Sequence, residues 1–116
     1  MKYLFVCVVL FLFTSLNAAD ALVQADSLFK LRDINFDADR LIADTTDVNA
    51  AMALYSFVLK NDADRSRRTE ALWKLLQAYY FKGQFGTDDL KMKKKIYAQG
   101  LEIGEQYVNV LNESVE

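Results

Sequence analysis

The chain has 116 residues, with 14 Lys and Arg against 16 Asp and Glu, and it contains neither His nor Pro. The lack of His removes the usual general base and the commonest metal ligand, so we expect no catalytic residues, no metal site and no cofactor. The net charge of −2 argues against nucleic-acid binding, which needs a basic surface. The lack of Pro favours uninterrupted helices over a sheet with many turns.

Residues 1–19 have the pattern of a cleavable secretory signal peptide. The basic start Met1-Lys2 precedes a wholly apolar run, Tyr3–Phe13, and a segment of small and polar residues that ends at Ala19. The pattern fits cleavage before Asp20 or after Ala18. A membrane anchor is the alternative, but the apolar run is shorter than the roughly 20 residues of a spanning helix. We therefore expect a periplasmic or secreted protein with no stable membrane span.

The single cysteine, Cys7, lies inside the apolar run and not at the cleavage point, where a lipidated export signal carries it. After cleavage the chain would have no thiol, which excludes a disulfide framework and a cysteine-based metal site. Packing alone would then stabilise the mature domain.

Apolar residues recur at spacings of three and four along most of residues 20–116, as in amphipathic helices. This periodicity predicts helices over Asp20–Arg32, Asn49–Asn61 and Arg68–Gly83, and a last helix from the cap Thr87-Asp88-Asp89 to about Leu111. Asp37–Ala43 could form a further short helix. We expect Gly83 to end its helix in a left-handed C-terminal cap.

In the last helix the packed face is predicted to carry Tyr97, Gly100, Leu101, Gly104, Tyr107, Val108 and Leu111. A Gly inside a helix costs about 1 kcal/mol relative to Ala. We therefore expect Gly100 and Gly104, four residues apart, to let another backbone come close.

Two stretches match the tetratricopeptide repeat. Six residues match its first helix and four match the second helix of the preceding unit: Leu72, Leu75, Ala78, Tyr79, Gly83 and Phe85, and Ala51, Tyr55, Val58 and Leu59. Residues 70–75, 78–81 and 94–105 more closely resemble one branch of that superfamily. This branch contains the periplasmic T-component proteins associated with TRAP transporters and the microtubule-dynamics regulators.

The resemblance implies an all-α domain over residues 20–116, built from antiparallel helix pairs of α-solenoid type. About one and a half to two repeats are present, fewer than the three or so that solenoids usually need. Three explanations stay open: a piece of a longer protein, a minimal bundle capped by its first helix and residues 37–43, or a protein that pairs with another chain.

By the same resemblance, a concave binding surface would be lined by Glu70, Trp73, Gln77, Tyr80 and Phe81. Aromatic side chains suit such a surface because they offer a large contact area with few rotatable bonds. The alternative is that the N-terminal helix covers these side chains as part of the core.

Two basic clusters, Arg65–Arg68 and Lys91–Lys95, could bind anions. Pairing with neighbouring acids on a solvated helix surface is the simpler interpretation.

The sequence therefore predicts an exported, non-enzymatic helical module that binds a protein or small ligand. Its most specific form is a periplasmic accessory of a TRAP-type transport or envelope system. The alternative is a structural or oligomerisation fragment of a longer tetratricopeptide protein, without a ligand groove of its own.

Overall fold

The computed structural model describes residues 17–33, 36–37 and 42–113, and residues 1–16 of the expected signal peptide, Cys7 among them, lie outside these ranges. The described residues form four α-helices: α2 (Ala18–Phe29), α3 (Thr46–Asn61), α4 (Arg65–Phe85) and α5 (Leu90–Glu113). A 3₁₀ turn, η1 (Lys30–Asp33), follows α2, and two short strands, β1 (Phe36–Asp37) and β2 (Ile42–Ala43), precede α3. The expected all-α class is confirmed.

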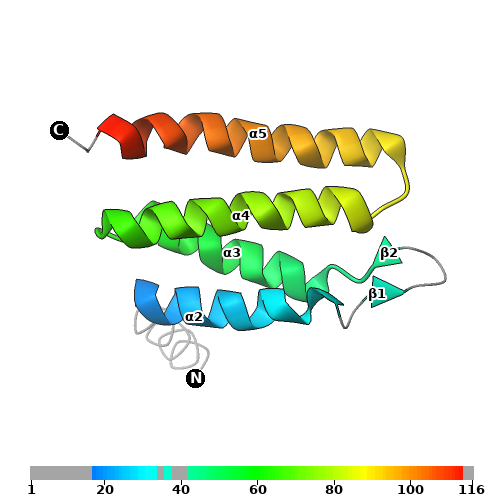
Figure 1. Cartoon of the computed structure of the whole chain (residues 1–116), viewed down its shortest axis with the longest axis horizontal. Coiled ribbons are helices and arrows are strands. Elements are labelled where there is room, and N and C mark those ends of the chain that lie inside the picture. The colour runs from blue at the N-terminus through cyan, green and yellow to red at the C-terminus, as the bar shows by residue number, and fades with distance from the viewer. Residues whose placement is uncertain (1–16, 34–35, 38–41, 114–116) are drawn as a thin grey trace, which may run out of the picture.

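Successive helices run in alternate directions and each packs against the next one in the chain (Figure 1). Helix α4 also contacts α2, so it lies against both members of the α2–α3 pair. Helix α5 lies at one side of the array, next to α4. In the part of the chain that the structure describes, no helix has both the length and the hydropathy that crossing a bilayer requires.

The core lies between α2, α3 and α4. Its most deeply buried large side chains are Tyr55, Leu59 and Leu75, and alanines on all three helices surround them. Each helix contributes positions three or four residues apart: Ala21, Leu22 and Ala25; Ala51, Tyr55, Val58 and Leu59; Ala71, Leu72, Leu75 and Ala78. This is the stripe that a 3.6-residue period buries, and the small alanines let the helices come close together.

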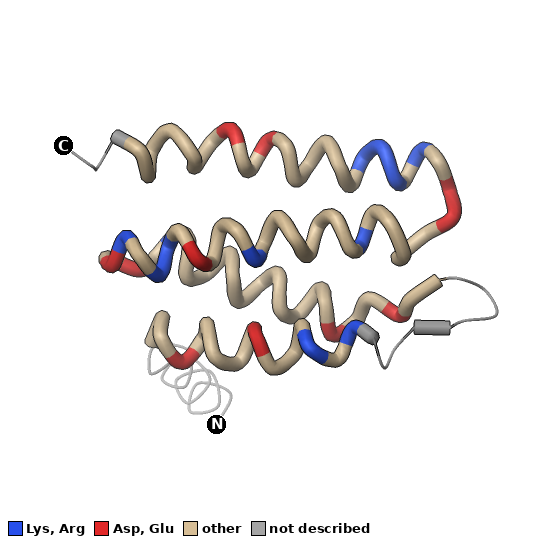
Figure 2. Tube along the Cα trace, viewed as in Figure 1, with Lys and Arg blue, Asp and Glu red and all other residues tan. Residues whose placement is uncertain are grey.

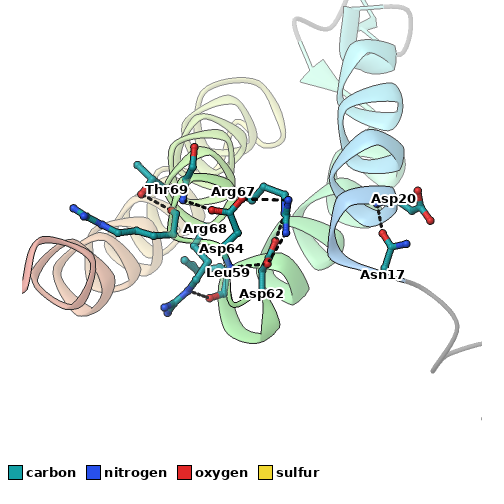
Figure 3. Close-up of polar contacts among 10 residues, drawn as sticks. Asn17, Asp20, Leu59, Asp62, Asp64, Arg67, Arg68 and Thr69 are labelled. Atoms are coloured by element: carbon teal, nitrogen blue, oxygen red, sulfur yellow. Dashed lines mark hydrogen bonds and ion pairs between the residues drawn. The ribbon is translucent and has the colours of Figure 1, made fainter. Parts of the chain in front are cut away.

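The turn between α3 and α4 is held by an acidic cluster that begins α4 (Figure 3). Asp64 is the N-cap, and its carboxylate accepts a hydrogen bond from the Ser66 amide at 3.0 Å. Asp62 accepts from the Asp64 amide and from Arg67 Nε at 2.6 Å, with only 5% of its side chain exposed. Arg67 holds the pKa of Asp62 below its ordinary value, against the opposing effect of burial.

These contacts explain why α4 begins at Arg65 and not at Arg68, where the sequence predicts its start. Two carboxylates before the first turn offset the unfavourable interaction of the arginines with the positive end of the helix dipole. The Arg68 side chain also donates to the Leu59 carbonyl at 2.9 Å, which ties the start of α4 to the end of α3.

The described ends of the short helix considered above, Asp37 and Ile42–Ala43, are strands and not helical. Phe36 pairs with Ala43 and Asp37 with Ile42 in an antiparallel ladder, and residues 38–41 lie outside the described residues. A helix this short is marginal in water because few hydrogen bonds repay its nucleation. The strand pairing instead accompanies burial of Ala43 against the core.

Gly83 does not end α4 in a left-handed cap, because the helix continues through Phe85. Gly86 is the C-cap, with a negative φ of −81° and its amide bonded to the Lys82 carbonyl. A Cβ on Gly83 would lie 2.5 Å from Tyr97 Cε1. Gly83 is therefore required for the close approach of α5, not for a turn.

Candidate protein-binding groove between α4 and α5

Glycines set the distance between α4 and α5. A Cβ on Gly100 would lie 3.1 Å from the Tyr79 Cβ, and one on Gly104 would lie 3.7 Å from the Leu76 methyl carbons. With the contact of Gly83 on Tyr97, three glycines mark the line along which the helices meet. Gly100 and Gly104 therefore allow a close approach, as expected. The space that their Cβ atoms would occupy is filled by side chains of α4 and not by its backbone.

A groove of about 510 Å³ runs beside this line of contact. Its apolar lining consists mainly of Leu76, Tyr79 and Tyr80 from α4 and Tyr97, Leu101 and Val108 from α5. Tyr80 and Leu101 are 62% and 64% exposed. Because only α4 packs closely against α5, this edge of α5 has no cover within the described chain.

The groove continues toward the N-terminal end of α4. An adjoining hollow of about 250 Å³ shares Leu76 and Val108 with it and adds Trp73, Leu111 and Arg65. Trp73 is 65% exposed. We call the two hollows together the α4–α5 groove: an apolar surface about as long as α4, with Arg65 at one end.

The predicted binding residues divide among four places. Trp73 and Tyr80 line the α4–α5 groove, and α2 does not cover either side chain. Glu70 lies in a shallow hollow beside Trp73, and Gln77 lines a separate pocket near α2. Phe81 is not on the surface. It is 9% exposed, in the core.

The burial of Phe81 comes from packing that the sequence pattern does not reveal. Its ring meets Phe29 of α2 edge-on, with centroids 6.3 Å apart, and lies 5.2 Å from the ring of Phe85. One residue of helix turns a side chain by about 100°, which takes Phe81 from the exposed side of Tyr80 to the side that faces α2.

A polar pocket of about 340 Å³ lies between α2 and α4 and is distinct from the α4–α5 groove. Asp26 lies at its centre, where it accepts hydrogen bonds from the Tyr55 hydroxyl at 2.6 Å and from Lys74 Nζ at 2.8 Å. Burial raises the pKa of Tyr55, and the Asp26 carboxylate raises it further. Burial alone would lower the pKa of Lys74, but Asp26 and Glu70 outweigh it and the pKa is raised. These charges pair with each other and tie α2, α3 and α4 together.

One member of each basic cluster shows how part of it is engaged within the fold. Arg67 is bound by Asp62 and also lies 3.2 Å from Asp64. Lys93 donates to the carbonyls of Gly83 and Gln84 at 3.0 and 2.9 Å, where it stabilises the C-terminal end of α4. The Arg67 contacts agree with the simpler interpretation, pairing with neighbouring acids, whereas Lys93 contacts backbone carbonyls of α4 instead of an acid.

The sequence pattern did not single out the α5 side of the groove. It placed Leu101 and Val108 on the packed face of the last helix, yet both are exposed. The sequence did indicate this side of the groove through the width of the apolar face of α5, because α4 covers only part of that face. A helix with more apolar surface than its neighbour buries is typical of an edge where something else binds.

The lining of the α4–α5 groove is mainly apolar. Among residues 17–33, 36–37 and 42–113, no three His, Cys, Asp or Glu side chains are grouped so that they could hold a metal ion. The same residues include no buried side-chain nitrogen or oxygen atom without a hydrogen-bond partner. Comparison of the chain with protein-family models, curated proteins and solved structures gives no match.

Proposed function

We propose that the chain is an exported helical module that binds a protein partner through the α4–α5 groove. The observation that carries the proposal is the exposure of Trp73, Tyr80 and Leu101, each more than 60%, on one continuous apolar surface. Full burial of such a side chain contributes about 1.5–3 kcal/mol. Three of them in one groove are enough for a specific interface to form around them.

The shape of the groove favours a helix as the bound element. Two antiparallel helices in contact leave a furrow between them, and apolar side chains of a third helix fit into it at spacings of three and four residues. The fold contains an example, because α4 itself lies against both α2 and α3. An amphipathic helix in the α4–α5 groove would repeat that arrangement one step along the array.

The cellular context of the proposal comes from the sequence. Residues 1–19 support export to the periplasm or beyond. The resemblance to the T-component branch supports an accessory of a TRAP-type transport or envelope system, in which binding of another protein would be the whole activity. The absence of His and of a cysteine outside the leader gives no support to a catalytic role.

The second candidate is a structural or oligomerisation role. In its purely structural form every aromatic side chain would be core, and the exposure of Trp73 and Tyr80 disfavours that form. Oligomerisation uses the same apolar surface, so it differs from the first candidate only in the identity of the chain that is bound.

Site-specific photo-crosslinking in the source cell tests the proposal. A photoreactive phenylalanine analogue replaces Tyr80 in the groove, and in a matched control it replaces Gln106, which is exposed. Gln106 follows Leu101 by five residues, which puts it about 140° around α5. We expect a covalent product with a protein from position 80 and none from position 106. Equal products from both positions, or none from either, would contradict a groove that binds protein.

A further inference from the structure

We infer that the groove is occupied by a second copy of this chain, with the two α5 helices packed antiparallel about Leu101. The inference rests on the proposed function and names its partner. In this arrangement α5 of each copy lies in the furrow between α4 and α5 of the other, so the two grooves close each other in a four-helix bundle with two-fold symmetry.

The spacing of residues along the exposed edge of α5 is the first argument. Leu90, Lys94, Tyr97, Leu101, Gly104 and Val108 follow one another at alternating steps of four and three residues. This is the repeat of a helix that packs against another helix along a seam. Four of these residues line the groove, and Leu90 is exposed.

The edge is also nearly symmetric about Leu101. Lys94 precedes Leu101 by seven residues and Val108 follows it by seven. An antiparallel pair of α5 helices therefore sets Leu101 against its own copy at the two-fold axis. The same pairing sets Lys94 beside Val108 and Tyr97 beside Gly104 and Glu105 of the second copy.

The sizes of the paired residues match. Tyr97 is the largest side chain on this edge, and it would meet Gly104, which has no side chain and lines the groove. A large side chain opposite a Gly lets the two helix axes come close without a clash or a void. Within one copy the contact between Tyr97 and Gly83 already shows such a pair.

The charges match in the antiparallel direction only. The basic residues of α5 lie near its beginning and the acidic ones near its middle (Figure 2). A parallel pair would set like charges side by side. In the antiparallel pair Lys94 lies within one turn of Glu105 of the second copy, close enough for its ammonium group to reach the carboxylate.

The available area is close to what a stable interface needs. Helix α5 has 24 residues and is therefore about 36 Å long. Two adjacent helices, each about 10 Å wide, make a strip of about 700 Å². Stable interfaces bury about 800 Å² on each partner, and the groove adds area to the flat strip because its walls are curved.

Light scattering of the exported, purified chain gives the first test. We expect a dimer for the natural chain and a monomer for Leu101→Glu, which sets two carboxylates against each other at the axis. The dissociation constant should rise at least about a hundredfold. Gln106→Glu makes a comparable change of charge away from the groove and should leave the dimer intact. Leu101 is exposed, so the monomer should keep the helical content of the natural chain, and its melting temperature should not depend on the chain concentration.

Crosslinking through cysteine gives the second test, on the exported chain, which has no natural thiol once residues 1–19 are cleaved. A short bismaleimide should join two copies of L101C rapidly and two copies of Q106C slowly. A natural chain that is monomeric at about 100 μM would overturn the inference. So would a dimer that Leu101→Glu leaves intact and in which L101C crosslinks no faster than Q106C.

The photo-crosslink at Tyr80 separates the two proposals. A product of twice the chain mass supports both the proposed function and the second copy. A product with a different protein, from a chain that is monomeric in light scattering, keeps the proposed function and refutes the second copy. The absence of any product from Tyr80 refutes both.

Discussion

Substituting Ala at Gly104 should stabilise the chain, whereas substituting Ala at Gly100 should not. Both glycines lie inside α5, so each substitution gains about 1 kcal/mol from the higher helix propensity of Ala. At Gly104 the new methyl would lie 3.7 Å from the Leu76 methyl carbons, an ordinary contact. Gly104→Ala should therefore stabilise the chain by about 0.5–1 kcal/mol.

At Gly100 the same methyl would lie 3.1 Å from the Tyr79 Cβ and 3.4 Å from its Cγ. The Cβ is fixed to the backbone of α4, so the two helices must separate by a few tenths of an ångström. Such overpacking costs about 1–3 kcal/mol, which cancels or exceeds the gain in propensity. We expect Gly100→Ala to be between neutral and about 2 kcal/mol destabilising.

The assay is thermal unfolding followed by far-UV circular dichroism. Both variants are made in a Leu101→Glu background, so that self-association does not contribute. A difference of 1 kcal/mol corresponds to about 4–8 °C in melting temperature for a domain of this size. Equal stabilisation by the two substitutions would refute the close contact of α4 and α5 at Gly100, and with it the geometry of the groove.

Three further predictions follow from burial and from hydrogen bonds, each measured by denaturant unfolding. Leu75→Ala, in the core, should lower the free energy of unfolding by about 2.7–5 kcal/mol. Trp73→Ala, two residues earlier, should lower it by no more than about 1–2 kcal/mol, because 65% of the Trp73 surface is already exposed. Similar losses for the two variants would place Trp73 in the core. Asp62→Asn should cost about 1.5–3 kcal/mol at pH 7. Arg67 lowers the pKa of Asp62 below its ordinary 3.8, so the stability that this pair contributes is complete above pH 3.8 and is lost as the pH falls through the lower pKa of the folded state. If the natural chain lost no more stability than the variant over this pH range, the pairing would be contradicted. Tyr55→Phe should cost about 1.5 kcal/mol by removing the hydrogen-bond donor to the Asp26 carboxylate, whose side chain is 34% exposed. An unchanged stability would show that water replaces the hydroxyl fully.

The helices could be predicted because each presents an apolar stripe at a 3.6-residue period. Residues such as Leu22 and Ala25 of α2 lie where this period puts them. The ends were less predictable, because they depend on contacts between side chains and backbone. Asp62 and Asp64 start α4 three residues earlier than the arginines alone suggest, and the two-residue strands β1 and β2 are too short to show any period.

The candidate site could be predicted on α4 and not on α5. Trp73 and Tyr80, seven residues apart, share a helix face that the core does not need, and that relation is visible in the sequence. The burial of Phe81 depends on Phe29, more than fifty residues earlier, so no local pattern indicates it. The exposure of Leu101 depends on how many helices cover α5, which is a property of the whole array.

The position of Trp73 also decides how this protein can be followed by its fluorescence. It is the only tryptophan in the chain, and its indole is already mostly in water in the folded domain. In the monomeric Leu101→Glu chain, unfolding should therefore shift the emission maximum of Trp73 very little, and a fluorescence melting curve would underreport the transition that circular dichroism sees. Closure of the α4–α5 groove would remove water from the same indole and shift its emission to shorter wavelength. The natural fluorescence is therefore a poor probe of folding and a direct probe of docking.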